Sequence, residues 1–204
     1  MNVFLEHFLI PDANETNVYL IACLETRQAA LIDAGGFDPR VVEAAREREF
    51  RVGVILITHD HYDHTGAIGE YVSSFPACEI VAGSSRAGGR TARAVRDGEI
   101  IAVGNLEARA LSIPGHTSDS TAYHFTRRAG AATAGKAAPE ISVVFSGDAL
   151  FAGSVGGTSG EAAHEREKAG IREKLFVLPG ATIIYPGHGP ATTVDVEKRY
   201  NPFF

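Results

Sequence analysis

Histidine and aspartate are concentrated in one short segment, which reads Thr58-His59-Asp60-His61-Tyr62-Asp63-His64. His59, His61, Asp63 and His64 supply four nitrogen or oxygen donors within six residues, and such donors held close together bind divalent metal ions. In a helix His59 and His61 would point roughly to opposite sides. In a tight loop after a strand both could reach one ion. We therefore expect a metal site on this loop, with Asp63 and His64 at the start of a following helix.

Three further loops carry a residue that could complete the site. His116 and His188 each follow a Pro-Gly pair, and Asp148 follows Ser146-Gly147. Rigid proline and permissive glycine make a sharp corner that can direct the next side chain into a cleft. Each loop also follows an apolar stretch, and ligands in α/β proteins collect where strands end and loops begin. We expect the four loops to converge on one rim.

The sequence predicts two metal ions in this cleft. The first would be held by His59, His61 and His116. The second would be held by Asp63, His64 and His188. Asp148 has two carboxylate oxygens and would bridge both ions. Zinc is the expected metal, and iron and manganese also suit these donors. The other three histidines are expected to be ordinary residues, namely His7, His124 and His164.

Apolar strands alternate with helices in the elements that must position these loops. Strands are expected at Val18–Cys23, Ala30–Asp33, Val52–Ile57, Glu79–Ala82, Leu106–Ile113, Thr121–Phe125, Ile141–Phe145 and Ile183–Tyr185. Helices are expected from Pro39 to about Phe50, over Thr65–Ser73 and over Glu161–Leu178. Ser84–Arg96 is interpreted as an irregular basic stretch and Arg127–Pro139 as a mobile insert. No linker divides the chain, so we expect a single domain over residues 1–204.

The composition indicates which kinds of binding partner to expect. Nineteen basic and 25 acidic residues give a net charge of −6, which gives no reason to expect nucleic-acid binding. The longest apolar runs, such as Val54–Ile57, are too short to span a membrane, and no signal peptide is visible. Cys23 and Cys78 do not make a disulfide framework and suit buried thiols in a reducing cytosol. We expect a cytoplasmic protein that acts on a small molecule.

The four loops together resemble the metallo-β-lactamase superfamily. The matching segments are Thr58–Gly66, Pro114-Gly115-His116-Thr117, Ser146–Phe151 and Pro186-Gly187-His188-Gly189. This resemblance implies an α/β fold, a four-layer αββα sandwich with a metal cleft at one edge. The segments Gly147–Phe151 and Glu197–Phe203 are most similar to glyoxalase II-type (hydroxyacylglutathione hydrolase-like) enzymes and their short bacterial relatives. Asp148 stands where the best-known β-lactamases have cysteine, which disfavours antibiotic hydrolysis.

The implied activity is hydrolysis of a thioester or ester by a hydroxide that bridges two metal ions, with Asp63 orienting it. Glyoxalase II also has a C-terminal helical domain that helps to bind glutathione, whereas this chain ends soon after His188. Lactone hydrolysis on the same ligands and a non-catalytic binding module are alternatives. A third is a mononuclear iron persulfide dioxygenase using His59, His61, His116 and Asp148. That branch carries an Arg-Asp pair where this chain reads Gly156-Gly157-Thr158-Ser159.

Substrate-facing walls are expected from Asp12–Asn17, Ser84–Arg96 and Gly153–Glu161. The second of these segments contains Arg86, Arg90, Arg93 and Arg96. These arginines would either attract an anionic substrate or form a solvated basic face. Partners that fix the histidine tautomers are required in such a site, but no motif names them.

Overall fold

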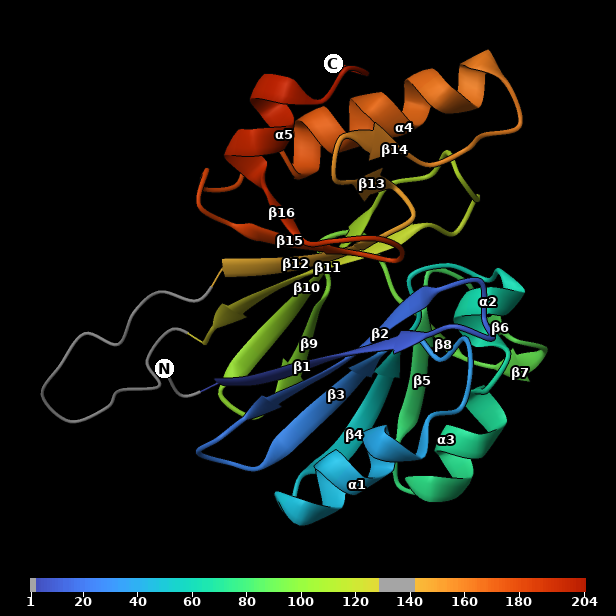
Figure 1. Ribbon diagram of the computed structural model, residues 1–204, viewed down its shortest axis with the longest axis vertical. Coiled ribbons are helices and arrows are strands. Elements are labelled where there is room, and N and C mark those ends of the chain that lie inside the picture. Colours follow the sequence, from blue (N-terminus) through green and yellow to red (C-terminus); the bar gives the residue numbers. More distant parts are fainter. Residues whose placement is uncertain (1–2, 129–141) are drawn as a thin grey trace, which may run out of the picture.

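The computed structural model describes residues 3–128 and 142–204. Two six-stranded sheets pack face to face, and helices cover the outer side of each (Figure 1). Helices α1 (Pro39–Glu47) and α3 (Ile68–Ser74) lie against the first sheet, and α4 (Glu161–Lys174) and α5 (Val194–Tyr200) lie against the second. The predicted αββα sandwich is thereby confirmed.

The first sheet brings the ends of its parallel strands to one edge. Its order is β1 (Val3–Ile10), β2 (Thr16–Cys23), β3 (Gln28–Ile32), β4 (Arg51–Leu56), β5 (Glu79–Ala82) and β8 (Arg93–Ala94). The pairs β3–β4 and β4–β5 are parallel, so the segments that follow β3 and β4 emerge side by side. These segments carry Asp33 and the histidine-rich loop.

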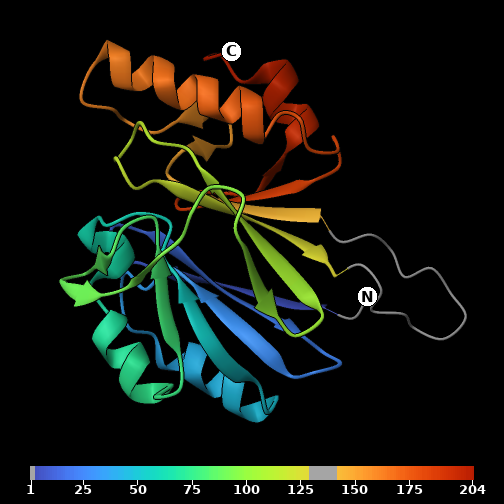
Figure 2. The ribbon, with the colours of Figure 1, turned by 180° about the vertical axis from the view of Figure 1, so that it is seen from behind.

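The second sheet brings the loops that carry Asp148 and His188 to one edge in the same way. Its order is β16 (Thr192–Thr193), β15 (Ile183–Pro186), β12 (Ser142–Gly147), β11 (Thr121–Arg127), β10 (Leu106–Ser112) and β9 (Ile100–Val103). Strands β12 and β15 are parallel, and this places Asp148 and His188 just beyond neighbouring strand ends. Seen from behind, α4 and α5 lie across the outer face of this sheet (Figure 2).

Three buried clusters fill the three interfaces of the sandwich. Strand β2 is buried along its whole length, and its side chains alternate between two of these clusters. Tyr19 and Ile21 join the cluster between the sheets, whereas Val18 and Leu20 join the cluster beneath α1 and α3. The third cluster packs α4 and α5 on the second sheet and includes Ile171 and Val194. Period-two alternation of apolar residues on a strand covered on both faces accounts for this arrangement.

Several predicted boundaries were wrong. The helix expected over Thr65–Ser73 is divided into α2 (Tyr62–Thr65) and α3, and the helices begun at Pro39 and Glu161 end earlier than expected. The basic stretch at 84–96 contains the hairpin of β6 (Arg86–Ala87) and β7 (Arg90–Thr91), and the strand β8.

Some elements were not anticipated, namely β1, β9, α5 and the hairpin of β13 (Leu150–Phe151) and β14 (Ser154–Val155). Of the insert at 127–139, only Arg127 and Arg128 lie within the described residues. Cys23 is buried as expected, whereas Cys78 is only half-buried.

Over residues 3–128 and 142–204, no helix has the length and apolar character needed to cross a membrane.

Candidate metal centre

The histidine-rich loop is held by direct backbone contacts between β3 and α2. Asp63 lies in the first turn of α2 and His64 in its last. The N–H of Ala34, just after β3, donates to the carbonyl of His64 at 2.8 Å. A Cβ atom on Gly35 would lie 1.6 Å from the carbonyl oxygen of Asp63, so only glycine permits this approach. The end of β3 therefore fixes where α2 begins.

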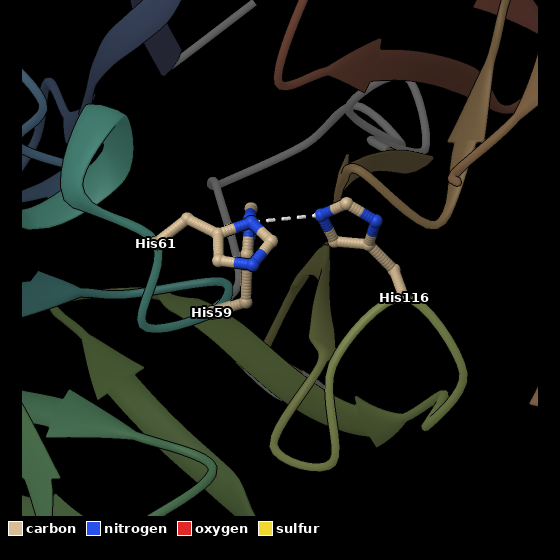
Figure 3. A group of neighbouring side chains, drawn as sticks. All are labelled: His59, His61 and His116. Carbon is tan, nitrogen blue, oxygen red and sulfur yellow. Dashed lines mark hydrogen bonds between the residues drawn. The ribbon is translucent and has the colours of Figure 1, made fainter. Parts of the chain in front are cut away.

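Three ring nitrogens converge at the first candidate site. Nδ1 of His61 lies 3.1 Å from Nε2 of His59 and 3.0 Å from Nε2 of His116. Figure 3 shows a ring nitrogen of His116 directed at a ring nitrogen of His61, with His59 beside His61. Two ligands of one tetrahedral zinc ion, each bonded at about 2.0–2.1 Å, lie roughly 3.3 Å apart. The spacing of these nitrogens is therefore close to that of a zinc ligand set.

A second triad lies beside the first. Nε2 of His188 is 3.3 Å from Nε2 of His64 and 3.5 Å from Oδ2 of Asp63. The loop that carries His188 is brought here by a bridge to Thr16, at the start of β2. Three groupings in the described chain have donor atoms within 4.8 Å of one another: His59/His61/His116, Asp63/His64/His188 and His59/His64/Asp148.

The carboxylate of Asp148 lies between the two triads. Its Oδ2 is 3.6 Å from Nε2 of His116 and 3.5 Å from Nε2 of His188, and its Oδ1 is 3.3 Å from Nε2 of His64. Oδ1 is buried and has no hydrogen-bond partner among the described residues. An unpaired carboxylate oxygen facing imidazole nitrogens is what a cation would satisfy. The residues present thus fit a pair of divalent ions.

Hydrogen bonds behind the rings set the histidine tautomers. Asp33 accepts from Nδ1–H of His64 at 2.9 Å, and from the hydroxyl of Thr58 at 2.9 Å. Because that hydroxyl is donated to Asp33, its oxygen accepts from Nδ1 of His59, 3.1 Å away. Nδ1–H of His116 donates to the carbonyl of Gly157 at 2.7 Å. In the neutral form of each of these three histidines, Nε2 carries the lone pair and faces the cleft.

The charges in the centre follow from burial and proximity. Burial, together with the charge of His64, lowers the pKa of His59 to about 2. Burial also disfavours a charged His64, but the carboxylates of Asp33 and Asp148 outweigh it and raise the pKa of His64 to about 10. Burial alone would raise the pKa of Asp148, yet the close contact with the charged ring of His64 lowers it to about 2. Without metal, His64 therefore keeps a second proton, on Nε2, beside the ionised Asp148. A bound cation would displace this second proton.

Sequence reasoning missed the residues that support the ligands. Asp33 directly follows the apolar residues of β3. A charged residue at the end of such a strand was the signal that could have identified it. Glu167 is fully buried in α4, and its Oε1 accepts the backbone N–H of His116 at 3.0 Å. Asn17 donates to the carbonyls of Pro186 and Gly189, at 3.0 and 2.8 Å. No spacing pattern marks Glu167 or Asn17.

The segments expected as substrate-facing walls each contact a ligand-bearing loop. Asn14 donates to Asp63 at 3.1 Å, the N–H of Gly88 donates to Asp60 at 2.6 Å, and Gly157 accepts from His116. Among the arginines of the second segment, Arg93 forms ion pairs with Glu79 and Glu99. The three ordinary histidines are outside the cluster: His7 contacts Asn17, His124 contacts Ser142 and His164 packs on Phe203.

The chain is similar in sequence to known proteins over most of its length. The chain is 31% identical over 173 residues to the probable hydroxyacylglutathione hydrolase glo2 of Schizosaccharomyces pombe, covering 83% of this chain and 62% of that protein. It therefore spans about three fifths of the length of such relatives. It is 30% identical to the hydroxyacylglutathione hydrolase GloC of Haemophilus influenzae, and the match covers 88% of both chains.

A solved structure shows the same fold. The metallo-beta-lactamase from Staphylococcus aureus subsp. aureus COL superposes with a TM-score of 0.83 at 25% identity, covering 100% of this chain and 63% of that one. Residues 11–129 match the sequence profile of the Metallo-beta-lactamase superfamily, and this region includes the first triad and Asp63 and His64. The chain belongs to the metallo-β-lactamase superfamily.

Proposed function

We propose that this chain is a metal-dependent hydrolase that cleaves a thioester or ester and holds two divalent cations, zinc first among them. The observation that carries the proposal is the position of Asp148, whose carboxylate contacts histidines of both triads. The names of the relatives support the substrate class, since hydroxyacylglutathione is a thioester of a hydroxy acid.

Two such cations held by these residues would lower the pKa of a bound water to about 7 and would polarise the carbonyl under attack. Asp63 has one carboxylate oxygen 3.5 Å from His188, so it can both ligate at the second triad and orient the attacking water. Asp33 and Gly157 hold the rings in the tautomer that ligation requires. A thiolate is a good leaving group, so the chain needs no strong general acid.

The test begins with metal counting and substrate assays. We expect about two zinc ions per chain after zinc supplementation, and hydrolysis of S-lactoylglutathione or of another thioester or ester. Fewer than one ion per chain together with no hydrolysis of any ester or thioester would overturn the proposal.

A substitution tests the bridging role of Asp148. The Asp148→Ala variant should lose both ions and nearly all activity, because each triad loses a shared carboxylate. His164→Ala, on the outer helix α4, is the matched control and should keep both. Full activity in Asp148→Ala would remove the bridging assignment.

The alternative of a mononuclear iron persulfide dioxygenase needs only the first triad and Asp148. The presence of a complete second triad favours two ions over one. One iron per chain, with oxygen consumption on glutathione persulfide, would establish the alternative instead. We also propose a cytoplasmic location from the two free cysteines, which cell fractionation would test.

A further inference from the structure

One polar residue outside the candidate ligands reaches into the centre from the turn between β1 and β2. Nδ2 of Asn14 donates to Oδ2 of Asp63 at 3.1 Å. The same oxygen lies 3.5 Å from Nε2 of His188, on the side of the second triad. The amide of Asn14 therefore contacts the carboxylate oxygen that faces the second candidate ion.

Asn14 is held in a backbone conformation that side chains rarely adopt. The N–H of Thr16 donates to the carbonyl of Ala13 at 3.0 Å, which closes a four-residue turn. Both central residues, Asn14 and Glu15, have φ of 56°, as in turn type I′. Asparagine adopts this left-handed region more readily than most residues, whereas glutamate has no such preference.

The rest of the turn is fixed without the side chain of Asn14. Ala13 is buried in the cluster beneath α1 and α3. Thr16 is fully buried, and its hydroxyl donates to the carbonyl of Ala13 at 2.6 Å. These anchors hold both ends of the turn, and the two exposed residues between them have the left-handed conformation. Strained backbone that its surroundings maintain is typical of functional sites.

We propose that Asn14 is a positioning residue for Asp63, and that it orients the carboxylate toward the second ion. A neutral amide suits this role because it donates a hydrogen bond without adding charge or competing as a ligand. This inference rests on the proposed function, in which Asp63 ligates that ion. It assigns to the β1–β2 turn a part in metal binding that the histidine motif does not contain.

Two glycine substitutions separate positioning from backbone strain. Asn14→Gly removes the amide and relieves the left-handed φ. Glu15→Gly relieves the same φ at the neighbouring exposed position and leaves the amide in place. Three readouts are compared with the unsubstituted protein: the Tm of the metal-free form in chelator, zinc affinity by calorimetric titration, and kcat and KM for a thioester.

Neither substitution should lower Tm, because glycine adopts this conformation freely, and Glu15→Gly should raise it. Asn14→Gly should weaken binding of the second zinc ion by about 10- to 100-fold and lower kcat, as loss of a ligand's hydrogen-bond partner does. Glu15→Gly should leave zinc affinity unchanged.

Zinc affinity and kcat in Asn14→Gly within about twofold of Glu15→Gly would overturn the inference. So would a higher KM with unchanged zinc affinity, which indicates contact with substrate, or a lower Tm, which indicates a role in folding. If the unsubstituted protein binds two zinc ions but hydrolyses no thioester or ester, the proposed function fails while the zinc comparison still decides the role of Asn14.

Discussion

Replacing Glu167 by glutamine is expected to remove a pH dependence from the stability of the metal-free protein. The Glu167 side chain is fully buried; Oε1 accepts the N–H of His116 at 3.0 Å, whereas Oε2 has no partner among the described residues. Burial raises the pKa of this carboxyl from 4.5 to about 7; the hydrogen bond from His116 opposes the rise, and the charge of Asp148 adds to it.

The sign and size of the change in the free energy of unfolding with pH follow from whether the folded or the unfolded chain loses the Glu167 proton first. Below about pH 4.5 the carboxyl is protonated in both the folded and the unfolded chain, and its contribution to stability is complete. As the pH rises toward 7, the unfolded chain loses its proton first, so the free energy of unfolding falls. At about 1.36 kcal/mol per pH unit the whole loss is about 3 kcal/mol, and about 2.5 kcal/mol of it falls between about pH 5 and pH 8.

The assay is urea unfolding in chelator at several pH values across that interval. Glutamine keeps an oxygen to accept the N–H of His116 and has no charge, so the stability of Glu167→Gln relative to the unsubstituted protein should rise by about 2.5 kcal/mol from about pH 5 to pH 8. Glu165→Gln on the same helix is the control: the hydrogen bond from Lys168 lowers the pKa of that exposed carboxyl, so it stays ionised throughout. A change of less than about 0.5 kcal/mol in the Glu167→Gln difference would refute the reasoning.

Three further substitutions address how the ligands are held. Asp33→Asn removes the anionic acceptor for His64, so zinc affinity should fall by about 10- to 100-fold, as measured by titration, while the circular dichroism spectrum is unchanged. Gly187→Ala would place a Cβ atom 2.1 Å from Oδ1 of Asp148, so it should displace that carboxylate and lower kcat/KM by at least about 100-fold; activity near that of the unsubstituted enzyme would contradict the packing argument. Asn17→Ala breaks two hydrogen bonds to the loop before and after His188 and should lower Tm by about 4 °C, with retained Tm as the contrary result.

Much of the candidate centre could be predicted because its residues are clustered or marked by neighbours. His59, His61, Asp63 and His64 lie within six residues, and His116 and His188 each follow Pro-Gly. The structure brings together the same residues that the sequence grouped around each ion, although their role as ligands stays a prediction. The strands before these loops were found from their runs of apolar residues, most of which the structure buries at least in part.

Elements with mixed composition were harder to predict. Strand β1 pairs along its length with β2, yet Glu6 and His7 interrupt its apolar pattern. Helix α5 buries Glu197, whose carboxylate accepts hydrogen bonds from Gly153 and Thr192. From the sequence alone, such a carboxylate cannot be distinguished from a surface residue, because its burial and its hydrogen-bond donors depend on the tertiary structure.

The sequence by itself determined which side chains could bind metal, because that chemistry depends on donor type and on local loops. Only the tertiary structure decided how they are held. Asp33 meets His64 across 31 residues, Glu167 meets His116 across 51, and Asn14 meets Asp63 across 49. Many residue types carry a hydrogen-bond donor or acceptor, so the position of that atom in space decides which ligand it holds. Pairing of strands within the first sheet and packing of α4 on the second sheet set that position, and no spacing along the chain encodes it.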